Sequence, residues 1–134
     1  MPVPKHLVLD TNVLVSSLLS RRASPPSEIV SLVLNEFIKL CYDDRIFEEY
    51  KNVLQRPHFK FDPFLVRDIL ATIEFVGFDV VPERLSAVTS DPDDQAFYEV
   101  SKLCVCPLVT GNKKDFPNEP HIMTPSEYLD AMRG

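Results

Sequence analysis

The sequence contains little that would mark a membrane-bound, secreted or disulfide-stabilised protein. It has no tryptophan, only three glycines, and no apolar run near the ~18–20 residues that span a bilayer. The N-terminus, MPVPKHLVLD, lacks the long apolar stretch of a signal peptide. The three cysteines, Cys41, Cys104 and Cys106, form an odd set without the second ligand pair that a zinc site needs. These absences predict reduced thiols in a cytoplasmic protein with no membrane contact.

Positive charge is also scarce, because 14 Lys and Arg residues face 20 Asp and Glu residues, for a net charge of −6 at pH 7. A protein that binds nucleic acid through a broad electrostatic footprint normally needs clustered Lys and Arg. The deficit argues against that class of protein. It does not exclude a nucleic-acid enzyme whose local charge is inverted by bound cations.

Alternating strands and helices are the main feature that the sequence does contain, and its 134 residues favour one domain, 1–134. The expected strands are short apolar runs at 6–10, 37–42, 78–81, 105–110 and 121–123. Pro107 predicts that the fourth of these is short, bulged or at an edge. Expected helices follow Asp10, Ser24, Asp43 or Asp44, Asp62, Asp91 and Thr124. The pattern predicts a three-layer α/β/α sandwich with a mainly parallel sheet of about four to five strands.

Two positions mark helix ends within this pattern. Gly77 follows the apolar stripe of the fourth helix and is expected to stop it as a C′ residue. Thr124-Pro125-Ser126-Glu127 forms a capping box that predicts the start of the last helix.

Acidic and polar residues follow four of the predicted strands. They are Asp10 after the first, Asp43, Asp44, Glu48 and Glu49 after the second, Asp91, Asp93 and Asp94 after the third, and Thr110, Asn112 and Asp115 after the fourth. In sheets of this class the functional crevice lies beyond the carboxyl ends of the strands. We therefore expect these side chains to converge at one edge.

Each acid also has an ordinary structural interpretation. Taken alone, Asp10 is more readily interpreted as a helix cap than as a metal ligand. However, Asp10, Thr11 and Asn12 are all residues that can cap a helix, and one cap suffices. On a helical wheel Glu49 lies at the rim of the buried stripe, whereas Glu48 lies nearly opposite it, so we choose Glu49.

Several carboxylates brought together without bases repel one another unless a cation joins them. Oxygen ligands of this kind favour Mg²⁺ or Mn²⁺, which can polarise a phosphodiester for hydrolysis. A phosphotransfer domain would also place Asp at strand ends, but Asp10-Thr11-Asn12 lacks the second acid of a phosphatase motif.

Four segments together resemble the PIN-domain family, and they span residues 7–117. They are LVLDTNVLVSSLL, DRIFEEYKNVLQRPHF, SDPDDQAFYEV and LVTGNKKDFP. The branch that they resemble most contains the VapC-like ribonuclease toxins of bacterial type II toxin–antitoxin systems. The resemblance implies a Mg²⁺- or Mn²⁺-dependent ribonuclease with an RNA substrate, a cognate antitoxin and a homodimeric assembly. The alternatives are a non-catalytic RNA- or protein-binding module and a housekeeping RNA-processing nuclease.

The resemblance also implies roles for individual residues. Asp10, Glu49 and Asp94 correspond to the acidic core. The family usually has a fourth acid where Asn112 stands here, so either Asn112 or Asp115 supplies the fourth ligand. Asn12 and Thr110 are expected to orient the carboxylates or water.

Asp93 competes with Asp94 for the third position. An ideal wheel places Asp93 nearer the buried face of its helix, whereas the family spacing selects Asp94 and leaves Asp93 as a supporting charge. Asp91 is expected to cap the helix, with Pro92 in its first turn. The candidate phosphate contacts are Arg21, Arg22, Arg56, Lys60, Lys113 and Lys114.

Overall fold

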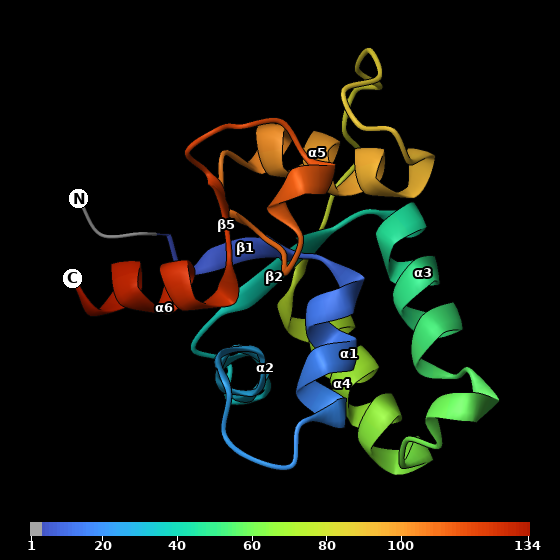
Figure 1. The fold of residues 1–134 in the computed structure, drawn as a ribbon. Coiled ribbons are helices and arrows are strands. Elements are labelled where there is room, and N and C mark those ends of the chain that lie inside the picture. The colour runs from blue at the N-terminus through green and yellow to red at the C-terminus, as the bar shows by residue number, and fades with distance from the viewer. Residues whose placement is uncertain (1–3) are drawn as a thin grey trace.

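A single parallel sheet organises the chain in the computed structural model, which describes residues 4–134 (Figure 1). Its five strands in this range are β1 (His6–Leu9), β2 (Lys39–Tyr42), β3 (Phe78–Asp79), β4 (Leu108–Val109) and β5 (Ile122–Met123). Their order is β3-β2-β1-β4-β5, and every neighbouring pair is parallel. The predicted α/β fold with a parallel sheet is confirmed, and the carboxyl ends of all five strands share one edge.

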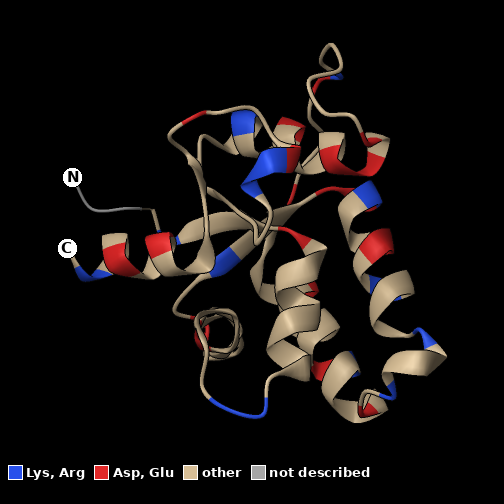
Figure 2. Cartoon of the chain, in the orientation of Figure 1, with Lys and Arg blue, Asp and Glu red and all other residues tan. Residues whose placement is uncertain are grey.

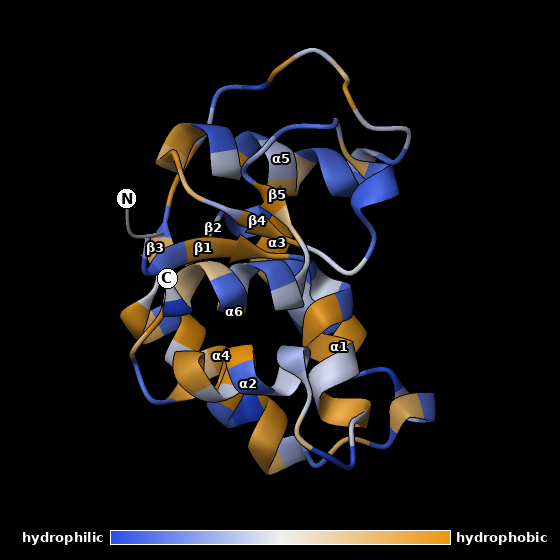
Figure 3. Ribbon diagram, turned by 60° about the vertical axis from the view of Figure 1, so that its left-hand side comes forward, coloured by the Kyte–Doolittle hydropathy of each residue, from blue (hydrophilic) through white to orange (hydrophobic). Residues whose placement is uncertain are grey.

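Helices cover both faces of the sheet. They are α1 (Thr11–Leu19), α2 (Pro25–Leu34), α3 (Asp44–Leu54), α4 (Pro63–Val76), α5 (Pro92–Cys104) and α6 (Pro125–Arg133), with short 3₁₀ turns η1 (Pro57–Phe59) and η2 (Lys113–Asp115). Figures 1 and 3 show α5 on one face and α1, α2, α4 and α6 on the other. Helix α3 stands at one end and contacts α5, α1 and α4. Within residues 4–134 no helix is both long and apolar enough to cross a bilayer.

The central strand β1 anchors the hydrophobic core. Leu7, Val8 and Leu9 are fully buried, as expected for a strand that has helices on both faces. The backbone continues this pairing past the strand, because the amide of Asp10 donates to the carbonyl of Val109 at 2.9 Å. The start of α1 is thereby fixed against the end of β4.

The strands are shorter than the sequence predicts. Strand β3 has two residues rather than four, and β4 also has two. Pro107 precedes β4 and cannot donate to a neighbouring strand, but its carbonyl accepts from the amide of Val8 at 2.9 Å. Strand β4 is therefore short, which is one of the three outcomes predicted from Pro107, but it lies inside the sheet and not at its edge.

Gly77 ends α4 for a reason that the sequence does not reveal. Its φ of −79° is not the left-handed conformation of a C′ glycine, so that expectation is wrong. The α-carbon instead lies against backbone, because an added Cβ would stand 2.5 Å from the carbonyl oxygens of both Ile73 and Leu40. Glycine is required here for the close approach of α4 to β2.

Replacing Gly77 by alanine is therefore expected to destabilise the fold by about 2 kcal/mol, because neither carbonyl belongs to a flexible side chain that could move away. Gly111 provides a matched control, since the nearest atom to its added Cβ is Asn12 Oδ1 at 3.7 Å. Gly111→Ala should change the free energy of unfolding by less than about 0.5 kcal/mol. Urea denaturation measures both, and equal losses would contradict the steric explanation.

The long connection between β3 and α5, residues 80–90, is tied to α5 by buried polar groups. The carboxylate of Glu99, which is 2% exposed, accepts from the amide of Leu85 at 2.9 Å. Gln95 donates to the carbonyl of Ser86 and accepts from the amide of Val88. Arg45 of α3 forms a 2.8 Å ion pair with Glu99. These contacts join α3 to α5 independently of the sheet.

Candidate acidic site

Carboxylates from four connections gather near the carboxyl edge of the sheet. Figure 2 shows acidic segments before α1, along α3, at the start of α5 and in η2. The electrostatic interactions between them link Asp10, Glu49, Asp94 and Asp115. The convergence expected from the strand ends is therefore present, although the roles proposed for these residues remain predictions.

Asp10 occupies the N-cap position of α1 without acting as its cap. Its side chain makes no capping hydrogen bond and is 6% exposed. The carboxylate instead accepts a hydrogen bond from the buried hydroxyl of Thr110 at 2.7 Å. The backbone amides of Asn12 and Thr11 also lower the pKa of Asp10, but a capping role alone does not account for its burial against Thr110.

Glu49 points inward from α3, whereas its neighbour does not. Its carboxylate accepts a hydrogen bond from the hydroxyl of Thr11, and the residue is half-buried. Glu48 is exposed and lies 3.7 Å from Lys51 in a surface ion pair. The helical wheel thus selected the acid that faces α1 and Asp10.

The three aspartates at the start of α5 have different surroundings. Asp91 caps the helix, because its carboxylate accepts from the amide of Asp93 at 2.9 Å. Asp93 is exposed, and Asp94 is half-buried. Asp10 is the carboxylate that acts most strongly on Asp94, whereas Asp93 is the one that acts most strongly on Glu49. This division favours Asp94 as the partner of Asp10.

Asn112 and Asp115, the two candidates for the fourth ligand, are hydrogen-bonded to each other. The Asn112 side-chain amide donates to Asp115 Oδ2 at 2.8 Å, and its backbone amide donates to the Thr110 hydroxyl at 3.0 Å. Asn112 is itself exposed. Its amide therefore holds Asp115, which adds to the effect of burial in raising the pKa values of both Asp10 and Asp94.

The pKa values of three carboxyls are raised, so the protein holds negative charge at an energetic cost. Burial raises the pKa of Asp10, and Thr110 opposes this by donating to the ionised form. The pKa of Glu49 rises for the same reason and is opposed by Thr11. Burial and then Asp10 raise the pKa of Asp94 to about 7. Among the described residues, no lysine or arginine lowers these three pKa values, and Lys113, the base beside the acids, pairs with Glu127.

This cluster should make stability fall as the pH rises. A carboxyl whose pKa is higher in the folded than in the unfolded chain binds extra protons when folded, and its favourable contribution is lost as the pH passes the folded pKa. For Asp94 the window runs from its ordinary value of 3.8 to about 7. Without divalent metal, Asp94→Asn should therefore raise the urea midpoint most at about pH 8, less at about pH 5, which lies inside this window, and least below pH 3.8.

The comparison with the variant isolates this contribution, because other titrating groups are common to both proteins. Equal urea midpoints of variant and wild type at the higher pH would show that Asp94 is not destabilised by its neighbours.

The candidate phosphate contacts do not form one surface. Arg21 and Arg22 are exposed in the loop after α1, so the length of that helix, roughly 14 Å, separates them from Asp10. Lys113 lies beside the acids but pairs with Glu127 of α6 at 3.1 Å. Lys114 is exposed in η2, and Arg56 lies beyond the far end of α3.

The donor set fits a hard divalent cation by its chemistry. The converging groups are carboxylates and one amide, the oxygen ligands that Mg²⁺ and Mn²⁺ prefer. Between residues 4 and 134, no three acidic, histidine or cysteine side chains lie close enough together to form a ready-made metal site. Neighbouring carboxylates repel one another, and a bound cation would offset that repulsion.

Several supporting groups are absent from the predicted set. Thr11 holds Glu49, and the hydroxyl of buried Tyr50 donates to the carbonyl of Leu9, next to Asp10. Glu99 and Arg45 connect the two helices that carry Glu49 and Asp94. The hydroxyl of a buried tyrosine such as Tyr50, and an acid within an apolar stripe such as Glu99, both need hydrogen-bonding partners. This requirement is the signal in the sequence that could have identified them.

One of three comparisons with known proteins gives a match. A family model described as a PIN domain matches residues 6–114. The matched range runs from β1 into η2, and it contains Asp10, Glu49, Asp94 and Asn112. No curated protein and no solved structure matches the chain.

Proposed function

The chain belongs to the PIN-domain family, whose members are generally nucleases, and from this premise we propose that it is a metal-dependent endoribonuclease. The substrate is RNA, and the reaction is hydrolysis of a phosphodiester bond. The observation that carries the proposal is the convergence of Asp10, Glu49, Asp94 and Asp115 from four connections, in which burial and neighbouring carboxylates raise the pKa values of Asp10, Glu49 and Asp94. Such a cluster is costly to keep for structural reasons alone.

Asp10 and Asp94 would hold the Mg²⁺ or Mn²⁺ ion, because Asp10 is the carboxylate that raises the pKa of Asp94 most, and because Asp10 is buried and Asp94 half-buried. Glu49 and Asp115 complete the negative charge around them. The metal supplies Lewis-acid polarisation of the phosphate and lowers the pKa of a water molecule. Asn112 contributes through its hold on Asp115, which makes Asp115 the fourth acid of the proposed site.

The two threonines position the carboxylates. Thr110 fixes one oxygen of Asp10, and Thr11 fixes one oxygen of Glu49. Glu49 keeps a second carboxylate oxygen for a ligand, whereas the carboxylate of Asp10 also interacts with the backbone amides of Asn12 and Thr11. Groups that orient ligands in this way typically matter nearly as much as the ligands themselves. Asn12 is exposed at the start of α1 and has its Oδ1 beside Gly111, where it can orient water or substrate.

Within this activity we assign the chain to the toxin side of a toxin–antitoxin pair that acts in the cytoplasm. The support is the resemblance of its four motifs to that branch of the family. The proposal includes a cognate antitoxin, whose arginine would neutralise the acidic cluster, and a homodimer. A role in housekeeping RNA processing is the alternative, and toxicity on expression in a host that lacks the antitoxin separates the two.

Neighbouring glutamates on α3 provide a direct test of the activity. Glu49→Gln should reduce Mn²⁺-dependent cleavage of a single-stranded RNA by at least about a hundredfold, because it removes an inward-facing acid. Glu48→Gln removes the same charge one residue away, from an exposed surface pair, and should cleave at the wild-type rate. Gel electrophoresis of end-labelled RNA measures both rates. Equal activity of the two variants would contradict the proposed site.

A further inference from the structure

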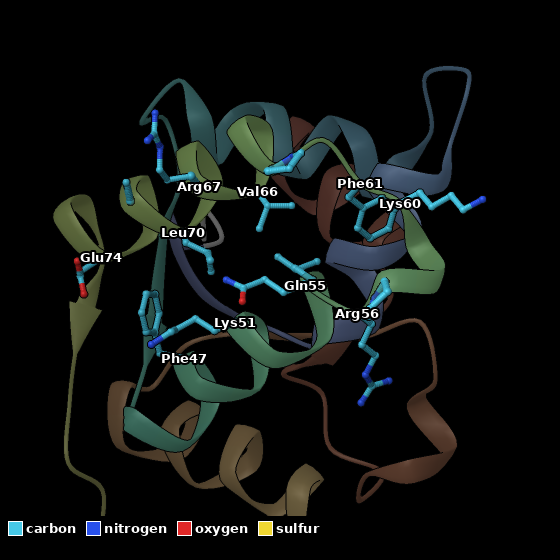
Figure 4. Close-up of a pocket in the computed structure, with 14 residues that line it drawn as sticks. Phe47, Lys51, Gln55, Arg56, Lys60, Phe61, Val66, Arg67, Leu70 and Glu74 are labelled. Atoms are coloured by element: carbon cyan, nitrogen blue, oxygen red, sulfur yellow. The ribbon is translucent and has the colours of Figure 1, made fainter.

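A groove between α3 and α4 is unrelated to the acidic site. It has a volume of about 670 Å³ and is drawn in Figure 4. Phe47 and Lys51 line it from α3, two residues before and after Glu49. At 100° per residue, a side chain two positions away points to nearly the opposite side of a helix. Glu49 faces Thr11 of α1, so α3 separates the groove from the carboxylates.

The floor of the groove is mainly aliphatic. Leu54, Val66 and Leu70 line it together with the aromatic rings of Phe47 and Phe61. Those two rings already have aromatic partners, since Phe47 packs on Tyr42 and Phe61 stacks on Phe59 with ring centroids 5.4 Å and 4.9 Å apart. Nucleic acid bases bind by stacking on free aromatic faces, so this floor favours apolar protein side chains over bases.

The rim of the groove is basic in a protein that is acidic overall. Four cations line it, Lys51, Arg56, Lys60 and Arg67, against one acid, Glu74. Lys51 also pairs with Glu48 at 3.7 Å, so the excess of positive charge rests on Arg56, Lys60 and Arg67. Figure 4 shows Arg56, Lys60 and Arg67 extending outward from the floor. With a net charge of −6 on the whole chain, this concentration of positive charge complements a negatively charged partner.

We infer that this groove binds an acidic amphipathic helix of another protein, with apolar side chains on the floor and carboxylates against the cationic rim. The flanking helices have 11 and 14 residues, about 16–21 Å, which matches roughly three to four turns of a bound helix. Helix-in-groove recognition uses this combination of an apolar stripe and charged flanks. The bound partner would leave the carboxylates open, so the inference does not depend on the proposed nuclease activity.

Three synthetic peptides of about four turns test the charge and the floor separately. The first has leucine on one face and glutamate on the other, the second replaces glutamate by lysine, and the third replaces leucine by serine. By fluorescence anisotropy the first should bind at least about tenfold more tightly than either of the others. Equal binding of the glutamate and lysine peptides, or no binding of the first at about 1 mM, would overturn the inference.

Charge reversal on the protein locates the site. The double variant Arg56→Glu/Arg67→Glu should weaken binding of the glutamate peptide by at least about tenfold, and both residues are exposed, so folding is preserved. The control Arg21→Glu/Arg22→Glu makes the same charge change in the loop after α1 and should bind as wild type. Equal losses in both double variants would show a general charge effect and refute the groove.

Two further measurements distinguish other occupants. A labelled oligouridylate, assayed in EDTA, should bind equally to wild type and to the groove variant Arg67→Glu, which alters none of the candidate phosphate contacts. A selective loss in the groove variant would assign the groove to RNA. Light scattering should give the same mass for wild type and groove variant, and a dimer that dissociates only in the variant would assign the groove to a second copy of the chain. Either result overturns the proposed protein partner.

Discussion

Replacing Asp10 by asparagine is expected to abolish Mn²⁺-dependent RNA cleavage, with a loss of at least about a thousandfold. Asp10 is the most buried acid of the cluster, and it follows the central strand of the sheet. Asparagine keeps the shape and can still accept the hydrogen bond of Thr110, so the variant removes the charge and little else. The initial rate of cleavage of an end-labelled RNA, normalised to folded protein, measures the effect.

The control is Asp130→Asn, which removes an acid whose side chain is 80% exposed on α6. It should cleave at the wild-type rate, and both variants should show the circular dichroism spectrum of the wild type. Because asparagine lowers the repulsion within the cluster, Asp10→Asn should be at least as stable as wild type without metal. Residual cleavage by Asp10→Asn equal to wild type would point to a contaminating nuclease and remove the proposed activity.

Mn²⁺ binding is expected to depend much more on Asp94 than on Asp93. The two variants Asp93→Asn and Asp94→Asn remove the same charge from adjacent positions, so their long-range electrostatic effects are similar. Asp94 is half-buried and raised in pKa to about 7 by burial and by Asp10, whereas Asp93 is exposed. A metal ligand contributes beyond its charge, and Asp94→Asn should therefore weaken binding at least about tenfold more than Asp93→Asn does.

Isothermal titration calorimetry at about pH 8 measures this difference, at a pH where the Asp94 carboxyl is ionised. A larger loss for Asp93→Asn would reverse the assignment of the third acid. No detectable binding by the wild type at millimolar Mn²⁺ would instead favour a PIN domain that binds RNA or protein without metal chemistry.

The architecture could be predicted from the sequence because its signals are local. Asp91-Pro92 and Thr124-Pro125 begin helices by their own capping chemistry, and Asp91 and Thr124 make the expected caps. Strand length and helix endings depend on distant neighbours. Gly77 is needed because of the carbonyl of Leu40, which is remote in sequence, and no periodicity reveals that contact.

The candidate site shows the same division. The rule that strand ends converge brought together Asp10, Glu49, Asp94 and Asp115 without any knowledge of distances. The helical wheel placed Glu49 nearer the buried side of its helix than Glu48, and the structure agrees. It also placed Asp93 nearer the buried face than Asp94, whereas Asp93 is exposed and Asp94 is half-buried. Asp93 lies in the first turn of α5, where the capping of the helix by Asp91 decides the geometry. The joining of Asn112 to Asp115 depends on the path of η2, which no pattern in the sequence describes.

The hydrogen bonds between α5 and the connection that precedes it, residues 80–90, determine where the chain can accept an insertion. The hydrogen bonds of this connection fall on Val80 at one end and on Leu85, Ser86 and Val88 at the other. Insertions are tolerated best where backbone hydrogen bonding is least affected. Insertions between residues 81 and 84 should therefore leave α5 and its acids in register with α3, which makes this stretch the natural place to graft an affinity tag or a new binding loop.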